Sequence, residues 1–498
     1  MARRRKKAKP PVEVDRLSAL PDELLHQIMA RGGIRAWEVA RTCILSRRWR
    51  KVWASAPCVD LRVFCNGTHR PPPENFSRFV KAFLRRRNRR VSLDTLRLLH
   101  VPTECDHEME DDEEHEQPSY DASDVARWVT HAVQRRNARV IEVTDHPEHL
   151  SCFKIKKHVS FASSHLQQLK LWHARLGGNT LEDVSFHCPC LQVLELKECI
   201  LEGSTNISSN SLSSLTQEKC RIWLDLSVNA PNLVSLRCVK PFSRAPSFGT
   251  MGSLSTATII LLDSFLETDT YHICKEHPDS KLGLSYSGDD ASYLYDDFYG
   301  CDTDSISTCQ YGELPDDDEH SSADSEDRSK NGSNSRLGGG HRNTTVSGGE
   351  KLLLSISNVT SLDLIAAPGE VILNRELKTC PMFSNLKTLF LGEWCLADDF
   401  GPLISFLDHC PILERLSIEL KSGKDRAVAM PVSNRQLTGR LLACAYLTKV
   451  KIIKCCGDDV RVGALVRLFV DSGMDSKKIF VRQTRKNCLL TSTTEVAL

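Results

Sequence analysis

The sequence predicts an α/β fold, in which a small all-helical unit precedes a solenoid of short parallel strands that a long acidic insertion interrupts. Three observations support this prediction. Closely spaced amphipathic patterns fill residues 15–62, a leucine-rich phrase recurs from residue 93 onward, and a stretch around residue 300 has no apolar period. The chain has 498 residues, and a prior of roughly 100–200 residues per domain suggests two to four units.

Composition excludes several classes of protein. Hydrophobic residues make up 41% and charged residues 26%, and the net charge is +1, so no overall field favours nucleic acid or an anionic membrane as a partner. No apolar run approaches the roughly 18 residues of a membrane helix, and no apolar segment follows the basic start. We therefore expect an intracellular protein, in the nucleus and/or the cytoplasm, whose 20 cysteines are mostly reduced.

The first 62 residues contain a tail and a helical unit. Residues 1–14 are basic and contain proline, so we expect a disordered tail. Its RRRKKAK stretch fits either a nuclear import signal or a solvated tail. In residues 15–62, Pro21 and two following acids fit a helix start, and Gly32-Gly33 fit its end. Apolar residues then recur at three- and four-residue steps up to Pro57, which predicts one or two further helices.

Residues 63–150 read as linker helices with the first irregular repeats. We expect helices in PENFSRFVKAFLRRR (73–87) and DASDVARWVTHAVQRR (121–136), and strands in VSLDTLRLLH (91–100) and ARVIEV (138–143). Between them, residues 104–117 form an acidic loop.

A leucine-rich phrase, L-x-x-L-x-L with apolar substitutions, recurs along the chain. Its starts at 166 and 191 differ by 25 residues, and those at 359, 386 and 413 differ by 27 each. A period of 20–29 residues with this phrase is typical of leucine-rich repeats. We expect each L-x-L to be a short strand with one buried face, which neighbouring repeats cover. The phrase begins at residues 93, 166, 191, 233, 359, 386, 413 and 447.

An acidic insertion divides the repeats. From Asp289 to Asp327 there is no Lys or Arg, and a glycine-rich stretch follows. Because this segment has no apolar period, we expect roughly residues 285–350 to be disordered. The predicted repeats therefore occupy 151–284 and 351–498.

The stretch HCPCLQVLELKEC (187–199) holds one His and three Cys, which raises the question of a metal site. In the related stretch HCPILERLSIEL (409–420) the His-Cys-Pro start and the apolar positions recur, but the other cysteines do not. The shared feature is thus the repeat phrase, and Cys188 and Cys410 are expected to pack as small buried hydrophobic residues. We predict no metal, no cofactor and no catalytic residue, since the sequence has no G-x-S-x-G, phosphate-loop or H-E-x-x-H motif.

The helical unit resembles an F-box, and the whole chain is similar to plant F-box/leucine-rich-repeat proteins. The stretches that carry the resemblance are DRLSALPDELLHQIM (15–29), RTCILSRRWRKVW (41–53) with the following P-x-x-D-L, and the later CPxLxxLxL phrases. The resemblance implies a substrate receptor of SCF-type cullin–RING ubiquitin ligases. The F-box of such a protein docks on a Skp adaptor, which connects it to the cullin and RING subunits, and the repeats bind a target protein, here unknown. Such a receptor transfers no ubiquitin itself.

Carried over by position, the resemblance assigns ten residues to the adaptor contact. A helical unit of this size buries little core alone and commonly needs a partner, and Trp and Leu on helices suit an interface. The alternative is that these residues pack the core of the unit itself. The ten residues are Leu20, Pro21, Leu24, Leu25, Ile28, Val39, Leu45, Ser46, Trp49 and Trp53.

Two further questions remain open in the sequence. The link ARGGIRAW (30–37) is one residue longer than is usual in the family and contains Gly32-Gly33, which makes a repeat scaffold without ligase association the alternative function. The arginines near Trp49 are interpreted as solvated or facing the adaptor, and neither a nucleic acid nor a membrane is expected as a partner. The target is expected to contact polar residues at the strands. The polar strand residues are Gln167, Lys170, Gln192, Glu195, Lys387 and Glu414.

Overall fold

The computed structural model describes residues 17, 19–31, 34–62, 75–99, 122–144, 153–155, 161–177, 179–261, 348–366, 370–396, 400–420, 444–454 and 460–483. All of these belong to one of the two units into which the chain divides, residues 1–266 with 346–498; the other unit is 267–345. The basic tail, Gly32-Gly33, the acidic loop 104–117 and most of the predicted insertion lie outside the described residues.

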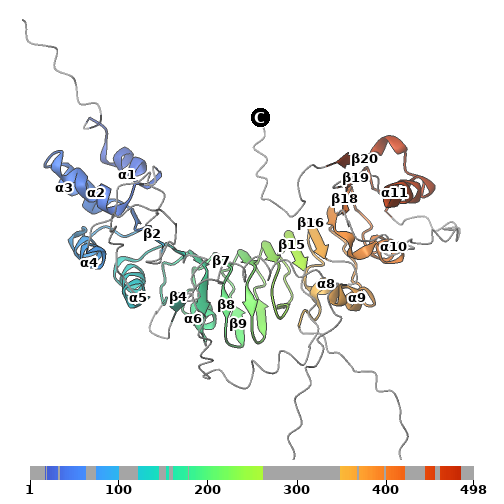
Figure 1. Ribbon diagram of the computed structural model, residues 1–498, viewed down its shortest axis with the longest axis horizontal. Coiled ribbons are helices and arrows are strands. Elements are labelled where there is room, and N and C mark those ends of the chain that lie inside the picture. The colour runs from blue at the N-terminus through green and yellow to red at the C-terminus, as the bar shows by residue number, and fades with distance from the viewer. Residues whose placement is uncertain are drawn as a thin grey trace, which may run out of the picture. The chain divides into compact units, whose positions relative to one another are not determined.

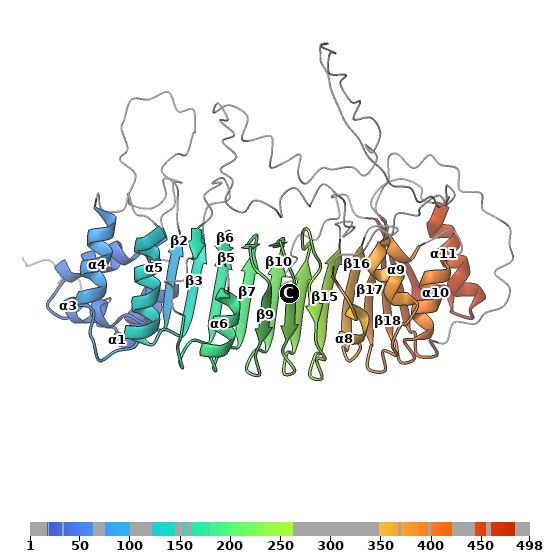
Figure 2. The same cartoon turned by 90° about the horizontal axis from the view of Figure 1, so that it is seen from below.

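The main feature is a sheet of thirteen parallel strands that pair in chain order (Figure 2). This sheet confirms the predicted α/β class. Its strands are β1 (Cys58–Asp60), β2 (Thr95–Leu99), β3 (Val140–Thr144), β5 (Gln168–Trp172), β7 (Val193–Lys197), β10 (Ser214–Glu218), β13 (Ser235–Val239), β15 (Thr256–Leu261), β16 (Ser361–Ala366), β17 (Thr388–Leu391), β18 (Arg415–Leu420), β19 (Lys449–Lys454) and β20 (Ile479–Gln483).

The N-terminal helical unit has a small core of its own. It comprises α1 (Asp22–Arg31), α2 (Ala36–Arg41), α3 (Trp49–Val52) and the short 3₁₀ turns η1 (Thr42–Ile44) and η2 (Trp53–Ser55). The unit is not wholly helical, because β1, which falls within residues 15–62, is the first strand of the large sheet. Trp37 of α2 also packs into the main core, so the unit and the sheet share apolar contacts.

A tight turn containing an X-Pro pair precedes three of the predicted repeat strands. The backbone N–H of Leu191 donates to the carbonyl of Cys188 at 3.0 Å, and Leu413 donates in the same way to Cys410 at 3.3 Å. Leu233 and Ala230 form the equivalent turn at 3.0 Å. Proline is favoured at the second position of such turns because its ring fixes φ, which explains why Pro follows each of these carbonyl residues.

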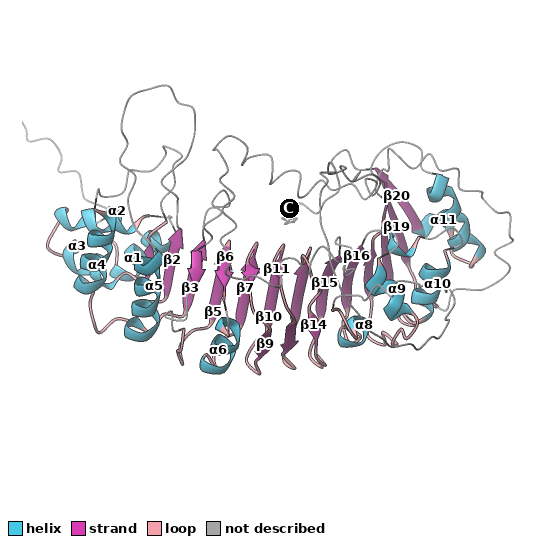
Figure 3. Ribbon diagram, turned by 60° about the horizontal axis from the view of Figure 1, so that its bottom comes forward, coloured by secondary structure: helices cyan, strands magenta, loops and turns pink. Residues whose placement is uncertain are grey.

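The length of a repeat limits which secondary-structure element can pack behind its strand of the large sheet. Two further phrases, which were not predicted, begin at Leu212 and Leu254, so the starts 191, 212, 233 and 254 follow at 21-residue steps. Behind these short repeats lie the short strands β8 (Ile200–Leu201) and β11 (Arg221–Ile222) in one sheet, and β9 (Thr205–Ser208), β12 (Leu226–Asn229) and β14 (Ser247–Phe248) in another. The first of these sheets continues to β6 (Ala174–Leu176), in the 25-residue repeat that begins at residue 166, and to β4 (Phe153–Ile155). Repeats of 25 and 27 residues have room for α6 (Thr180–His187), α9 (Val371–Leu377) and α10 (Gly401–Asp408) (Figure 3).

Alternate residues of most strands of the large sheet face the core. In β5, Leu169 and Leu171 are buried, and Gln168, Lys170 and Trp172 are partly exposed on the opposite face. Helices α6, α8 (Leu352–Ser355) and α9 lie on the same side of the sheet (Figure 1), and their buried residues join the leucines in one continuous core. The other face of the sheet, termed here the open face, carries the polar residues and a small apolar cluster of Val239, Ile260 and Ile365.

The chain rejoins the sheet at Gly348, after the unit 267–345. β15 and β16 pair in register although 99 residues separate Leu261 from Ser361. Gly348 (φ +83°) bridges to Ala245, and a Cβ on Gly348 would lie 2.1 Å from the carbonyl oxygen of Ala245. Only glycine fits this contact, so residues 348–350, at the end of the predicted insertion, are part of the packed structure.

Helices predicted in the linker are present. α4 (Phe76–Arg86) begins after Asn75, whose side chain accepts a hydrogen bond from the N–H of Arg78 at 3.0 Å. α5 (Ala122–Thr130) continues into a π-helical turn, η3 (His131–Arg135). The C-terminal α11 (Val460–Asp471), the short turns η5 (Glu393–Cys395) and η6 (Ser476–Lys478), and β20 complete the described elements.

Candidate interaction surfaces

Three of the ten residues assigned to the adaptor contact lie in the core of the helical unit. Leu25, Val39 and Trp49 are buried with Met29 and Val52. Leu25 and Met29 are one helical turn apart, so they occupy the same face of α1. For these three positions the structure favours the alternative role in the core, and they offer no surface to a partner.

The neighbouring face of α1 is exposed and apolar. Leu24 is 43% and Ile28 is 45% exposed, again one turn apart. Leu45, in the segment after η1, is 58% exposed, and Ile44, which was not among the ten, is 83% exposed. Single exposed apolar residues are ordinary, but four large ones on a unit of this size form a candidate interaction surface. We call Leu24, Ile28, Ile44 and Leu45 the apolar surface of the helical unit.

Arg48 ties the two halves of this surface together. Its guanidinium donates to the carboxylate of Asp22 at the start of α1, with Nε 2.8 Å from Oδ1, and also to the backbone carbonyl of Leu20. The segment with Leu45 is thereby held at the N-terminal end of the helix that carries Leu24. This position explains an arginine in the motif without any nucleic acid.

The remaining predicted contact residues lie around the apolar surface. Pro21 and Ser46 are exposed, and Leu20 and Trp53 are half-buried against the core of the unit. The Trp53 ring also contacts the Phe83 ring of α4, with centroids 5.1 Å apart. Ile34, in the longer link, packs against the same core.

The open face of the sheet carries a charged row. Arg97, Glu142, Lys170 and Glu195 occupy the same position on successive strands and are paired in register. Arg97 Nε lies 2.9 Å from Glu142, and Lys170 Nζ lies 3.4 Å from Glu142 and 3.9 Å from Glu195. Lys170 and Glu195 are thus on the open face as predicted.

A second polar set forms a pocket of about 450 Å³ over β17, β18 and β19. Its cations are Lys387, Arg415, Lys449 and Lys451. Of these four, Lys387 is among the polar strand residues predicted from the sequence, and the other three are not. Aligning the phrases at 413 and 447 would have found them, because it puts Arg415 with Lys449 and Ser417 with Lys451.

The cysteines of the repeats are buried donors to backbone carbonyls. Cys188 Sγ lies 2.9 Å from the carbonyl of Phe161, and Cys410 Sγ lies 3.3 Å from that of Phe406. Burial raises the pKa of Cys188 to about 11 and also raises that of Cys410. The prediction that both pack as small hydrophobic residues is confirmed. Among the described residues no group of three or more His, Cys, Asp or Glu side chains is placed to hold a metal ion, and no helix of this part is long and apolar enough to cross a membrane.

Comparison with known proteins places the chain beside plant F-box proteins. An F-box protein of Arabidopsis thaliana is 22% identical over 288 residues, which are 54% of this chain and 82% of the relative. Two F-box/FBD/LRR-repeat proteins of the same plant are 25% and 24% identical over 55% of this chain, and the matches span 64% and 62% of their lengths. No family model matches the chain. The relatives confirm the resemblance to plant F-box/leucine-rich-repeat proteins.

Proposed function

We propose that the chain is the substrate-recognition subunit of an SCF-type cullin–RING ubiquitin ligase. The helical unit docks on a Skp adaptor and through it on the cullin and RING subunits, and the repeats bind the target protein. The observation that carries this proposal is the apolar surface of Leu24, Ile28, Ile44 and Leu45 on a unit whose own core is already filled. The names of the relatives support the F-box assignment.

In this proposal the parallel sheet is a leucine-rich-repeat solenoid. The recurrent turn before each strand, the 21- to 27-residue steps and the in-register pairing of successive strands support it. Each repeat contacts its neighbours, so the open face presents a long row of polar positions to a target. Ubiquitin transfer takes place on other subunits, and the chain contributes binding.

Co-purification with a Skp adaptor tests the proposal. Leu24→Asp with Leu45→Asp places charges on the exposed surface without touching the core, whereas Trp49→Ala would empty the core of the unit and could abolish binding by unfolding it. The matched control is Phe186→Asp with Leu354→Asp, two exposed apolar residues outside the helical unit. Binding by the wild type and the control but not by the first variant supports the proposal, and equal binding by all three contradicts it.

The alternative is a repeat scaffold without ligase association, motivated by the longer link at Gly32-Gly33. Deleting Gly33 restores the usual link length. If the longer link prevents docking, the wild type stays out of cullin-containing complexes in cells and this deletion enters them. Recovery of the wild type with a cullin would rule the scaffold out.

We also propose a nuclear and/or cytoplasmic location. The RRRKKAK stretch of the tail supports the nuclear part. Imaging a fluorescent fusion with and without residues 1–14 tests it, since loss of nuclear signal is expected only on deletion.

A further inference from the structure

Charges on the open face are internally neutralised over the first half of the sheet. Lys170 lies between two glutamates, and Arg97 contacts one of them. The carboxylate of Glu195 also forms an ion pair with Lys197, whose Nζ lies 2.7 Å from Oε1. Each of these charged side chains therefore has a partner of opposite sign on the same face.

The face over β17, β18 and β19 is different. Lys387 pairs with Glu414 at 3.1 Å, and the ammonium of Lys449 lies 5.1 Å from the centre of the Phe480 ring. Arg415 and Lys451 have no ion pair with an acid among the described residues. Arg415 and Lys449 are directly paired in the strand register, and Lys451 follows two residues later on the same face.

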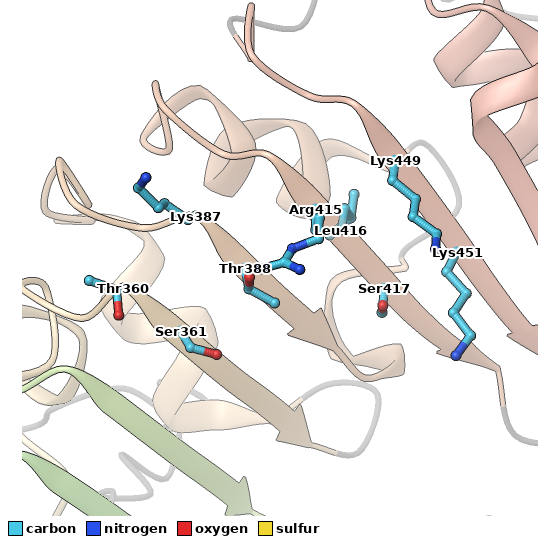
Figure 4. Close-up of a pocket in the computed structure, with 9 residues that line it drawn as sticks. All are labelled: Thr360, Ser361, Lys387, Thr388, Arg415, Leu416, Ser417, Lys449 and Lys451. Atoms are coloured by element: carbon cyan, nitrogen blue, oxygen red, sulfur yellow. The ribbon is translucent and has the colours of Figure 1, made fainter. Parts of the chain in front are cut away.

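These cations line the pocket of about 450 Å³ together with hydroxyl groups. Figure 4 shows the Arg415 side chain directed toward Thr388 on the neighbouring strand, with Lys449 and Lys451 along β19. None of the nine lining residues is acidic, and four of them are Thr360, Ser361, Thr388 and Ser417. Carboxylates accept hydrogen bonds from both guanidinium and hydroxyl groups, and strands about 4.8 Å apart hold these donors at fixed spacing.

The aromatic residues near the pocket argue against a nucleic acid. Binding of single strands uses aromatic rings on which bases stack. Phe390 packs against the apolar cluster of Val239, Ile260 and Ile365, and Lys449 lies over the ring of Phe480. Neither ring lines the pocket. The charge pattern without a stacking ring fits an acidic peptide better.

We propose that this pocket recognises an acidic segment of the target protein, with Arg415 and Lys451 as the main contacts. The inference rests on the proposed receptor function and names its class of substrate. Because Arg415 is exposed and Lys451 is partly exposed, each ion pair contributes little, so the affinity is expected to be modest and to fall with salt. Specificity comes from the fixed spacing of several cations on adjacent strands.

Fluorescence anisotropy with a labelled twelve-residue peptide of alternating Glu and Ser tests the proposal on the full chain. Arg415→Gln with Lys451→Gln should raise the Kd at least fivefold. The matched control, Arg97→Gln with Lys170→Gln, removes the same two residue types from the neutralised part of the same face and should change the Kd less than twofold. Equal effects of both double variants would overturn the proposal. Binding of an oligothymidine as tightly as the peptide, with loss in the first variant, would overturn it in favour of a nucleic acid.

Adaptor binding separates this test from the test of the receptor function. The first variant is expected to bind the adaptor as the wild type does, because its changes lie far along the chain from the helical unit. A wild type that binds the peptide through Arg415 but no adaptor would refute the receptor function and leave the acidic-peptide site standing.

Discussion

Arg35 and Asp60 form a buried ion pair that joins the helical unit to the sheet, with Nη1 2.6 Å from Oδ2. Arg35 directly precedes α2, and Asp60 ends β1. Arg62 donates to the same carboxylate at 2.7 Å. Burial lowers the pKa of Arg35, and the Asp60 carboxylate opposes this shift. The aspartate of the P-x-x-D-L motif is therefore a structural residue that holds the start of α2 against the first strand of the sheet.

Asp60→Asn is expected to destabilise this junction. Removing one charge of a buried pair leaves the other uncompensated, at a cost of about 3–5 kcal/mol. Hydrogen exchange of the α2 amides measures the local opening free energy. The control Glu142→Gln removes a partly exposed acid from the open face and should cost below about 1 kcal/mol. Equal exchange in both variants would show that the pair does not hold the junction.

Gln217 occupies a core position that the repeat phrase reserves for an apolar residue. It pairs in register with Leu196 and Cys238, is buried, and its Nε2 has no hydrogen-bond partner among the described residues. Gln217→Leu should therefore raise the melting temperature, since a buried Nε2 without a partner costs about 1–3 kcal/mol and the only bond lost is the long one from Cys238 Sγ to Oε1, at 3.9 Å, among the described residues. The partly exposed Gln168→Leu serves as control and should change the stability by less than about 0.5 kcal/mol. A lower melting temperature for Gln217→Leu would refute this reading.

Cys188 and Cys190 lie two residues apart but should differ in reactivity. Cys190 is exposed, whereas burial raises the pKa of Cys188 to about 11. Iodoacetamide at pH 8 is expected to label Cys190 in the folded protein and Cys188 only after unfolding, because the thiolate is the reactive form. Mass spectrometry of the peptide with both residues reads each site. Equal labelling would mean that Cys188 is accessible.

The raised pKa values also predict a pH dependence of stability. Burial raises the pKa of Cys188 and Cys444 from the ordinary 9.0 to about 11. The folded state then holds these protons more tightly than the unfolded state, so stability is complete below about pH 9 and falls as the pH rises through about 11. A variant with both residues changed to alanine should show a shallower fall in melting temperature between pH 8 and pH 11. An equally steep fall would assign it to other groups.

Much of the fold could be predicted because each repeat carries its own signal. The L-x-L alternation fixes which residues are buried, and the X-Pro turns mark where strands begin. The repeats at Leu212 and Leu254 were missed because Gln217 and Ala257 stand where leucine is expected. Their strands, β10 and β15, form because each pairs with a neighbouring strand on both sides.

The candidate surfaces were harder to predict than the fold. The helical period alone does not tell which of the neighbours Leu24 and Leu25 faces the core of the unit. That depends on where α3 packs, and its residues Trp49 and Val52 bury Leu25. Trp49 is of a residue type common at interfaces, but it lies in the core of the helical unit. The basic pocket depends on cations from three strands, which become neighbours only through the strand register.

Hydrogen–deuterium exchange of the full chain with and without a Skp adaptor tests the receptor function most directly. We expect added protection in the peptides that cover Leu20–Arg31 and Thr42–Ser46, which carry the apolar surface, and no change over β17, β18 and β19. The Leu24→Asp with Leu45→Asp variant should lose this protection while its own exchange pattern stays native. Protection confined to the sheet, or none at saturating adaptor, would contradict the assignment of the helical unit as the adaptor-docking element.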